Sequence, residues 1–485
     1  MKKRVIGIIV SVELLLVIII PLITFNWVQG TKSIAENRNL TSFPSLFDSE
    51  GRIRDDLLVV LDDWFKDNIG LRDSFINLSS VISFNILHTS TSEKVEIGKG
   101  GWLFYSAENN LSIVDGTYPD FDEEKLALYC EQLVEVRNRL AEQGREFVLI
   151  LPPSKVSIYP EYIQSGDYHI METPADIIAD YIEGHSDLRV VRLKDALLEE
   201  KNKNGEQLYY KTDTHWNFRG RYVGYRKIIE DFNDWGLIDT PPLEARFYEK
   251  GAYSGDLARM LGAVNLDGDK CSEDSYNAVE LVGSFVQSVS NEKSEEFEAL
   301  MTAEGISDGG SMWTNPNESD GPSLLLYGDS MIGSCNIDYI AANFSETSFV
   351  WSYVLRQEMI DFVDPDIVAL DISERGLSSC LPGLFDSYLN IKIVKDKEKG
   401  ILDIYYEDNG KLESCYMPTW SEANDQSDLV WYEAEREGEN CWHVRVDLND
   451  HESGRYITHI YDGPNGSGKY ITATSFDVGK ITMSN

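Results

Sequence analysis

The chain has 485 residues, of which 42% are hydrophobic and 11% aromatic, so it is neither a disordered nor a fibrous repeat protein. Its formal net charge of −39 at pH 7 excludes nucleic-acid binding, because that binding depends on cationic side chains. The same charge opposes adsorption to an anionic membrane surface, so membrane attachment would need a dedicated segment.

A candidate membrane segment lies at the N-terminal end. Lys2, Lys3 and Arg4 precede a mainly apolar run over residues 5–27. About 20 apolar residues in a helix span a bilayer, and cations before the span favour a cytoplasmic N-terminus. We therefore expect an uncleaved single-pass anchor over residues 1–28, with the rest of the chain outside the cell. A cleaved signal peptide is the alternative.

The next segment, residues 29–95, is predicted to be a linker followed by a helical arm. Apolar residues recur at helical spacing over residues 53–84, with a break near Gly70. We expect this amphipathic arm to pack against the main domain.

An α/β domain is predicted over residues 96–392. A short hairpin is expected at residues 95–105, and the polar stretch 267–321 is either an insertion or an exposed hairpin. Strands are expected at 147–151, 188–193, 324–327 and 367–372, and helices at 123–144, 174–183, 195–201 and 219–235. Alternation of strands with helices is typical of a parallel sheet covered by helices.

The C-terminal part, residues 400–485, has a different pattern of apolar and turn-forming residues. Short alternating strands rich in aromatic residues, separated by turn signals, predict a small all-β sandwich.

The six cysteines form no CxxC motif and no cluster with histidine, so no zinc site is expected. Cys415 and Cys441 are the one pair that we would test as a disulfide, and unpaired thiols are the alternative.

The first candidate for chemistry is Ser330, which ends the triplet Gly328-Asp329-Ser330 after the apolar strand. A serine on a tight turn between a strand and a helix exposes its hydroxyl at the carboxyl edge of a sheet. Backbone N–H groups at the helix start can stabilise an oxyanion there. Many such triplets are ordinary turns, so the motif alone is weak.

The second candidate is the pair Asp213 and His215, just before a predicted helix. Residues i and i+2 of an extended segment share a face, so the carboxylate can orient the imidazole as a general base. A serine hydroxyl needs such a base to become nucleophilic. Asp213 could instead cap the helix, and His215 could be an ordinary histidine. With Ser330 they form the only coherent triad in the sequence.

The order of several motifs resembles the SGNH-hydrolase-like proteins of alginate and related polysaccharide O-acetylation, and in particular the DHHW family. The motifs are Gly101–Tyr105, Leu151–Lys155, Tyr159–Glu161, Thr212–Trp216, Ser254–Leu257, Tyr327–Ser330 and Pro365–Arg375. The Asp-x-His block precedes the Gly-Asp-Ser block, which is the permuted order. Thr214 stands at the second position of the DHHW motif in place of His.

The resemblance implies a three-layer SGNH-like α/β domain with a mostly parallel sheet. It implies Ser330 as nucleophile, His215 as general base and Asp213 as its orienting carboxylate, with backbone N–H groups near Ser330 in the oxyanion hole. Further possible neighbours of the site are Tyr327, Asp329 and Arg375, and for Tyr327 and Arg375 a packing or salt-bridge role is the alternative. No metal ion or diffusible cofactor is implied.

The C-terminal part resembles the GBS Bsp-like repeat of Gram-positive surface proteins. The matching segments are Pro418–Ser421, Asp428–Tyr432, Trp442 and Gly454–Tyr461. We expect most of these aromatic residues to fill the sandwich core, and a carbohydrate-binding platform is the alternative.

These features together predict a membrane-anchored, extracytoplasmic O-acetyltransferase of a Gram-positive surface that acts on a cell-surface or secreted polysaccharide. By analogy with the family, a membrane-bound O-acyltransferase would supply the acetyl group. The alternatives are a carbohydrate acetylesterase and a noncatalytic cell-wall glycan-binding protein. The charge of −39 favours neutral or sparsely charged glycans as partners.

Overall fold

The structure is a computed structural model. It describes residues 15, 19–27, 32–33, 38–47, 52–54, 56–72, 74–75, 79, 82–83, 89–90, 92–107, 110–117, 121–164, 172–248, 250–261, 273–276, 279–304, 306, 309–334, 336–377, 384–396, 400–408, 410, 412–421, 428–438, 440–448, 451 and 454–477.

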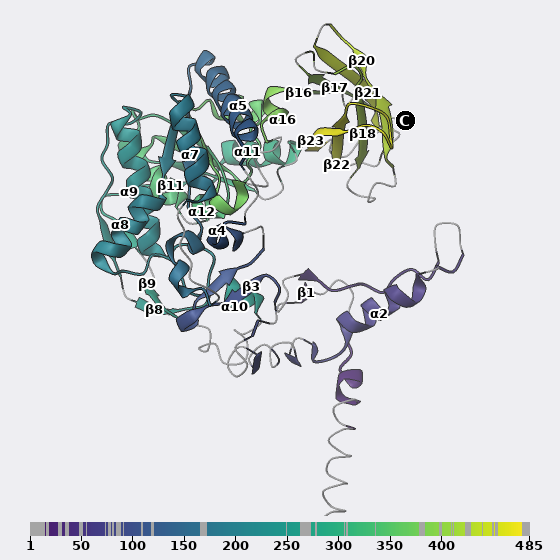
Figure 1. Ribbon diagram of the computed structural model, residues 1–485, viewed down its shortest axis with the longest axis horizontal. Coiled ribbons are helices and arrows are strands. Elements are labelled where there is room, and N and C mark those ends of the chain that lie inside the picture. The colour runs from purple at the N-terminus through teal and green to yellow at the C-terminus, as the bar shows by residue number, and fades with distance from the viewer. Residues whose placement is uncertain are drawn as a thin grey trace, which may run out of the picture.

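A seven-stranded sheet forms the centre of the described α/β domain (Figure 1). Its strands are, in spatial order, β11 (Gln287–Ser288), β12 (Gly310–Thr314), β14 (Glu346–Val350), β13 (Leu324–Tyr327), β15 (Ile367–Asp371), β5 (Glu146–Leu151) and β6 (Arg189–Arg192). The pairings from β14 to β6 are all parallel. β12 runs antiparallel to both β14 and β11, so the sheet is mixed, with a parallel centre.

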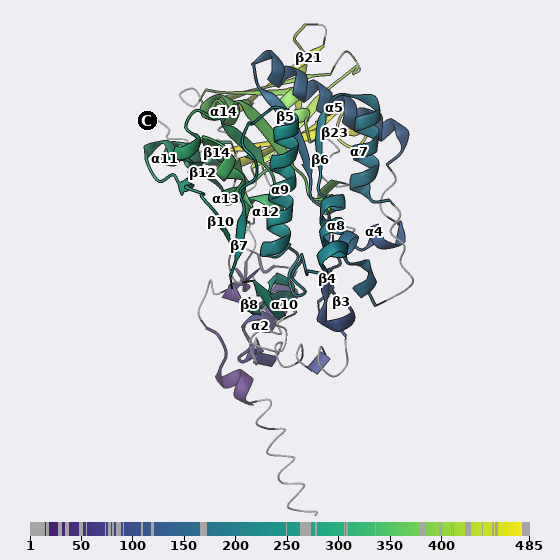
Figure 2. The same ribbon diagram turned by 90° about the vertical axis from the view of Figure 1, so that its left-hand side faces the viewer.

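Helices cover both faces of this sheet (Figure 2). The longer ones are α5 (Glu123–Glu142), α7 (Pro174–His185), α8 (Lys194–Asn204), α9 (Phe218–Asp234), α11 (Glu292–Ala303) and α14 (Gln357–Val363). The shorter ones are α4 (Ser112–Asp115), α6 (Lys155–Ile158), α10 (Asp256–Met260), α12 (Ser330–Gly333), α13 (Ile337–Ile340) and α16 (Asp386–Leu389).

Alternation along β5 shows why two layers of helices form. Val148 and Ile150 pack with α8 and α9, whereas Phe147 and Leu149 pack with α5 and α7. Successive side chains of a strand point to opposite faces, so an almost wholly apolar strand needs cover on both sides. The predicted three-layer α/β domain is therefore confirmed.

The predicted helices and strands of this domain are present, with ends that shift by a few residues. α5 begins after Asp122, whose side chain accepts a hydrogen bond from the N–H of Lys125. Gly144, with a φ of 79°, follows its end, where a left-handed residue is favoured. The predicted hairpin is the pair β3 (Val95–Ile97) and β4 (Leu103–Tyr105).

The polar stretch 267–321 is not only an insertion. Its described part supplies α11, the edge strand β11 and its neighbour β12, while β9 (Glu273–Tyr276) pairs with β8 (Lys250–Tyr253) and β10 (Val279–Leu281) pairs with β7 (Ala245–Phe247). Edge strands are short and half exposed, so their sequences lack the apolar runs that mark β13 and β15.

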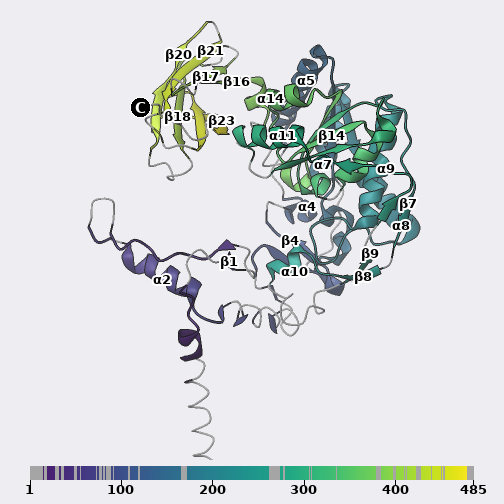
Figure 3. The same ribbon diagram turned by 180° about the vertical axis from the view of Figure 1, so that it is seen from behind.

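The C-terminal residues form two four-stranded antiparallel sheets within the part of the chain that the structure describes (Figure 3). One contains β16 (Ile391–Asp396), β17 (Ile401–Glu407), β21 (Cys441–Asp447) and β20 (Glu435–Arg436); the other contains β19 (Val430–Glu433), β18 (Tyr416–Ser421), β22 (Arg455–Tyr461) and β23 (Tyr470–Asp477). Buried side chains from both sheets pack together, as in a sandwich. Cys415 and Cys441 are free thiols, so the candidate disulfide between them is absent and the alternative of unpaired thiols holds for both.

The helical arm differs from the prediction. α2 (Leu57–Asn68) ends near the expected break, but Leu58 is 82% exposed and Val59 62% exposed. Its Trp64 instead packs against Phe25, with ring centroids 5.1 Å apart, and against Phe43 at 4.9 Å. The arm therefore packs on the chain's own N-terminal segment, because aromatic residues there provide the nearest apolar surface. In the sequence, the short antiparallel pair β1 (Lys32–Ser33) and β2 (Arg38–Asn39) lies between Phe25 and α2.

None of the helices within the described residues is both long and apolar enough to cross a membrane. The predicted anchor, residues 1–28, lies largely outside the described residues.

Candidate active site

Ser330 is the first residue of α12 and follows the buried strand β13 after a two-residue turn. Asp329 caps the helix, because its Oδ1 accepts the N–H of Met331 at 2.7 Å. Tyr353 donates its hydroxyl to the other oxygen of Asp329 at 2.6 Å. A Cβ on Gly328 would lie 2.7 Å from the Cβ of Asp371, so the turn requires glycine there. These contacts fix the serine at the carboxyl edge of the sheet.

The oxyanion donors near Ser330 are fewer than the sequence suggests. The N–H of Met331 is already bonded to Asp329, so it does not point to an incoming oxyanion. The N–H of Ser330 therefore stays the candidate backbone donor of this turn for an oxyanion.

Asp213, His215 and Ser330 lie in one hydrogen-bonded row. His215 Nε2 is 2.8 Å from Ser330 Oγ, and His215 Nδ1 is 2.6 Å from Asp213 Oδ1. A carboxylate only accepts, so Nδ1 carries the proton and Nε2 accepts the serine hydroxyl. The carboxylate is buried, with 4% of its side chain exposed, whereas 20% of the imidazole is exposed. This is the arrangement in which a histidine can take the proton from a serine.

The Asp213 carboxylate is saturated with donors. Besides the imidazole, it accepts the N–H of His215 at 3.0 Å, the hydroxyl of Tyr253 at 2.8 Å and the N–H of Asp256 at 3.0 Å. Burial by itself raises the pKa of Asp213, but the hydrogen bonds and charge of His215 outweigh it, so the pKa lies below its usual range. Asp213 therefore stays ionised and able to stabilise an imidazolium.

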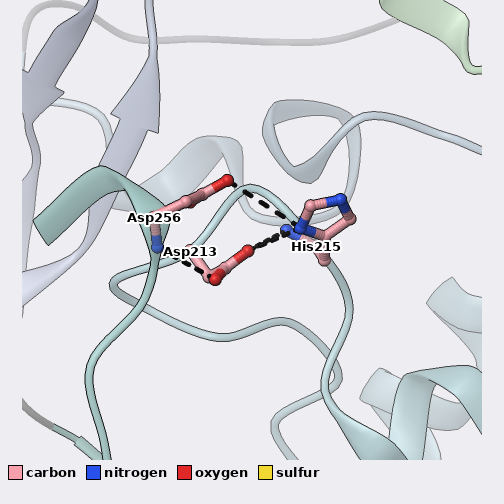
Figure 4. Close-up of side chains that lie close together, drawn as sticks. All are labelled: Asp213, His215 and Asp256. Carbon is pink, nitrogen blue, oxygen red and sulfur yellow. Dashed lines mark hydrogen bonds and ion pairs between the residues drawn. The ribbon is translucent and has the colours of Figure 1, made fainter. Parts of the chain in front are cut away.

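A second carboxylate, Asp256, supports the same loop (Figure 4). It accepts the N–H of Thr214 at 2.8 Å and the Thr214 hydroxyl at 2.6 Å, and its Oδ2 lies 3.9 Å from His215 Nδ1. Burial and the adjacent charge of Asp213 raise the pKa of Asp256. Gly255 allows this close approach, because a Cβ there would lie 2.4 Å from the Cβ of Asp213.

Lys155 holds the loop from the other side. Its Nζ donates to the carbonyls of Tyr210, Lys211 and Asp213, at 3.1, 3.2 and 2.6 Å. The residue is only 4% exposed, and its ammonium lies 5.2 Å from the centroid of the Phe104 ring. Carbonyl and ring partners of this kind offset part of the free-energy cost of burying an ammonium group.

A pocket lies beside the triad. Its lining includes Thr214 and Met331, the neighbours of His215 and Ser330, together with Tyr105, Ser373 and Arg375. The Arg375 guanidinium lies 5.5 Å from the centroid of the Tyr105 ring. Ser373 Oγ is buried and has no hydrogen-bond partner among the described residues. A polar group of a ligand that enters this pocket would meet a cation and a hydroxyl close to the nucleophile.

The three possible neighbours of the site lie in different places. Arg375 lines the pocket, and Asp329 lies directly behind Ser330 as the helix cap. Tyr327 does not join them: it packs in the core on the α5 and α7 face, and its hydroxyl donates to the Arg356 carbonyl at 3.3 Å. This is the packing role left open by the sequence, and the pleat explains it, because alternate residues at the end of β13 face opposite layers.

Among the described residues, one group of side chains could hold a metal ion: Asp213, His215 and Asp256, with ligand atoms within 4.8 Å of one another. His215 Nδ1 donates its proton to Asp213, and Asp256 accepts two bonds from Thr214. A metal would have to replace these bonds and remove the proton from Nδ1. The hydrogen bonding therefore favours a triad over a metal centre.

Several residues of the site have no local signal in the sequence. Tyr253 and Asp256 lie about 40 residues beyond Asp213 in the chain; the Ser-Gly-Asp-Leu motif contains Asp256, whereas no motif contains Tyr253. Ser373 has no motif of its own and enters the pocket because β15 ends there.

Two sequence families match separate parts of the chain. The family described as "SGNH hydrolase-like domain, acetyltransferase AlgX" matches residues 95–294, and the GBS Bsp-like repeat matches residues 393–476. The first match contains Asp213 and His215 and ends before Ser330.

Curated proteins named as probable alginate O-acetylases are also similar to part of the chain. The chain is 28% identical over 204 residues to the probable alginate O-acetylase AlgJ of Pseudomonas syringae pv. tomato, covering 41% of this chain and 48% of that protein. It is 29% identical over 175 residues to the AlgJ protein of Pseudomonas putida, covering 34% and 42%. The chain thus spans about half the length of these relatives.

Solved structures are similar at lower identity. The O-acetyltransferase domain of Pseudomonas putida AlgJ has a TM-score of 0.39 and 17% identity, covering 59% of this chain and 92% of that one. A DHHW family protein from Eubacterium siraeum has a TM-score of 0.36 and 14% identity, covering 52% and 85%. By these matches, residues 95–294 are similar to the SGNH hydrolase-like domain of the AlgX family and residues 393–476 to the GBS Bsp-like repeat.

Proposed function

We propose that this protein is an O-acetyltransferase that moves an acetyl group to a hydroxyl of a polysaccharide. The Ser330 oxygen attacks the acetyl carbonyl while His215 Nε2 takes the serine proton. The donor's leaving group then departs with that proton. In the second step Nε2 takes the proton of a sugar hydroxyl while the sugar oxygen attacks the acetyl-serine carbonyl. The bond from that carbonyl carbon to Ser330 Oγ then breaks, and Nε2 returns the proton to Oγ, which restores both residues.

One observation carries this proposal: the row of hydrogen bonds from Ser330 through His215 to Asp213, with distances of 2.8 and 2.6 Å. The three side chains come from two loops 115 residues apart, so local folding alone does not bring them together. The names of the AlgJ relatives, which are probable alginate O-acetylases, agree with acetyl transfer to a polysaccharide.

The cellular setting belongs to the same proposal. Residues 1–28 would anchor the chain, with the catalytic domain outside the cell, and a membrane-bound O-acyltransferase would supply acetyl groups. The described part of the anchor exposes Ile23 at 76% and Trp27 at 75%, which suits a lipid environment better than water. Extraction of the full chain from membranes only by detergent would support the anchor. Its recovery in the soluble fraction would contradict it.

Turnover of an activated acetyl ester tests the mechanism in the purified full chain. We expect Ser330→Ala and His215→Ala to lower kcat/KM by roughly a thousandfold or more, since each removes a member of the triad. His185→Ala, at an exposed histidine on α7, is the matched control and should retain full turnover. Unchanged turnover in Ser330→Ala would exclude this serine as the nucleophile.

Hydrolysis is the competing reaction of the same site. The imidazole is 20% exposed, so water can reach the acetyl-serine in place of a sugar. Measuring acetylated oligosaccharide and free acetate together separates a transferase from an esterase. If the protein is a transferase, added acceptor should increase the yield of acetylated oligosaccharide and decrease the yield of free acetate.

A further inference from the structure

The outer face of one sheet in the C-terminal sandwich carries a row of aromatic side chains. In β22, Tyr456 and Ile460 point into the core shared by the two sheets. His459 and Tyr461 alternate with them and therefore lie on the other face. On β19, Tyr432 packs against the core, and its neighbour Trp431 lies on the outer side.

The rings touch one another across the sheet. Going from β19 to β23, the centroids of Trp431 and Tyr461 are 5.1 Å apart, and those of Tyr461 and Tyr470 are 5.7 Å apart. His459 lies 5.2 Å from Tyr470 and 4.7 Å from Trp420 on β18. All four strands thus contribute to one aromatic face, which we define as Trp420, Trp431, His459, Tyr461 and Tyr470.

This aromatic face is open at Tyr470 and more covered toward Trp420. Tyr470 is 49% exposed, Trp431, His459 and Tyr461 are half-buried, and Trp420 is buried, with 6% exposed. Burial lowers the pKa of His459, which favours the neutral form of its ring. Polar groups lie at the edge: Tyr416 donates its hydroxyl to the Glu433 carboxylate at 3.1 Å.

The outer face of the other sheet is different. There Asp403 accepts bonds from His443 and Arg445, both at 2.8 Å, and Tyr405 stacks on His443 with centroids 4.5 Å apart. Charged pairs of this kind are usual on a solvated sheet face. The aromatic face is thus a property of one sheet and not of the whole module.

We propose that the aromatic face binds neutral polysaccharide chains. Pyranose rings stack their C–H faces on aromatic rings, and their hydroxyls find partners at polar edges such as Tyr416 and Glu433. The row of rings runs across the strands, which suits an extended chain of several sugars. The net charge of −39 would repel an anionic polymer, so the occupant is a neutral one. This site is separate from the triad and does not depend on its chemistry.

Calorimetric titration of the full chain tests the proposal, with a panel of neutral oligosaccharides of several hexose or pentose units and an oligouronate of equal length. We expect binding of at least one neutral class. The double variant Tyr461→Ala/Tyr470→Ala should weaken that binding by about tenfold or more, because two stacking rings are lost. Tyr405→Ala, on the opposite face, is the matched control and should bind as the natural chain does.

The outcomes separate this proposal from the acetyltransferase. Ser330→Ala should bind the glycan normally, and the double variant should keep its turnover of a small acetyl ester. The proposal is overturned if no neutral glycan binds, if the oligouronate binds more tightly, or if Tyr405→Ala weakens binding equally. A change in oligomeric state of the double variant in size-exclusion chromatography would also overturn it, since the face would then join copies of the chain.

Discussion

At the scale of single residues, the site depends on a carboxylate that is not part of the triad. Asp256 bonds both the N–H and the hydroxyl of Thr214, and its own N–H bonds Asp213. Thr214 Oγ1 also lies 3.1 Å from His215 Nδ1. Asp256 is therefore a positioning residue that fixes the imidazole from the side opposite the nucleophile.

We predict that Asp256→Ala lowers kcat by up to about a hundredfold, because a small displacement of the imidazole is enough to lose the serine contact. Asp256→Asn keeps one acceptor oxygen and should restore part of the rate. Kinetics on an activated acetyl ester, with KM measured separately, check this. Equal rates in Asp256→Ala and the natural chain would show that Thr214 holds the loop without this carboxylate.

Asp371 gives a prediction about pH. It is fully buried, and burial together with the charge of Asp329 raises its pKa well above the ordinary value. The folded chain therefore keeps a proton that the unfolded chain releases above pH about 4. As the pH rises from there toward the folded-state pKa, this group lowers the free energy of unfolding. Asp371→Asn removes the effect.

Urea unfolding at pH 4 and pH 7 measures the difference. The free energy of unfolding of Asp371→Asn, relative to the natural chain, should be higher at pH 7 than at pH 4. An identical difference at both pH values would mean that Asp371 has an ordinary pKa.

At the scale of elements, the turn from β13 to α12 decides where the nucleophile lies. The N–H of Gly328 donates to the Val350 carbonyl of the neighbouring strand at 3.1 Å. A Cβ added at Gly328 would point at the Asp371 side chain, 2.7 Å away. The turn is thus held between two parallel strands and leaves no room for a side chain.

Gly328→Ala should lower the free energy of unfolding by about 1–3 kcal/mol, as expected when atoms are added to a packed site, and should lower turnover with it. Gly184→Ala is the matched control. It lies in α7 with no atom within 4 Å of the added Cβ, so we expect a gain of up to about 1 kcal/mol. Equal stability of both variants would contradict the packing seen at Gly328.

Sequence patterns predict most elements of the α/β domain because buried parallel strands such as β13 and β15 are apolar throughout. The edge strand β11 and its neighbour β12 escape prediction because partial exposure leaves them without that pattern. The spacing of Asp213 and His215 predicts their shared face, but the contact with Ser330 follows only from tertiary packing. Tyr327 shows the limit: its position next to the motif does not reveal which face it occupies.

At the scale of the whole molecule, the net charge of −39 affects which acceptors can approach. Charges separated by more than about 10 Å are largely screened at 0.1 M salt. We predict that the rate of transfer to an anionic oligosaccharide rises as salt is increased from low concentration, whereas the rate to a neutral one stays nearly constant. Initial rates over a salt series with both acceptors measure this. Parallel salt dependences would mean that the overall charge does not influence the approach.

In the C-terminal module and in α2, the sequence pattern predicts the element but not the surface against which its side chains pack. Aromatic residues of the C-terminal module include core residues, such as Tyr456, and outer residues, such as Tyr461, in the same strand. Both belong to one alternating pattern, so the sequence alone does not tell which face is covered. The arm α2 is similar: its apolar stripe predicts a helix correctly but does not identify its packing partner.

The central claim is that Ser330 carries the acetyl group between donor and acceptor. Mass spectrometry of the purified chain, stopped soon after incubation with an activated acetyl ester, tests it most directly. The account predicts that the peptide containing Ser330 gains the mass of one acetyl group, that Ser330→Ala does not, and that added oligosaccharide removes the label. Acetyl ester turnover with no label on Ser330, or with full turnover in Ser330→Ala, would contradict it.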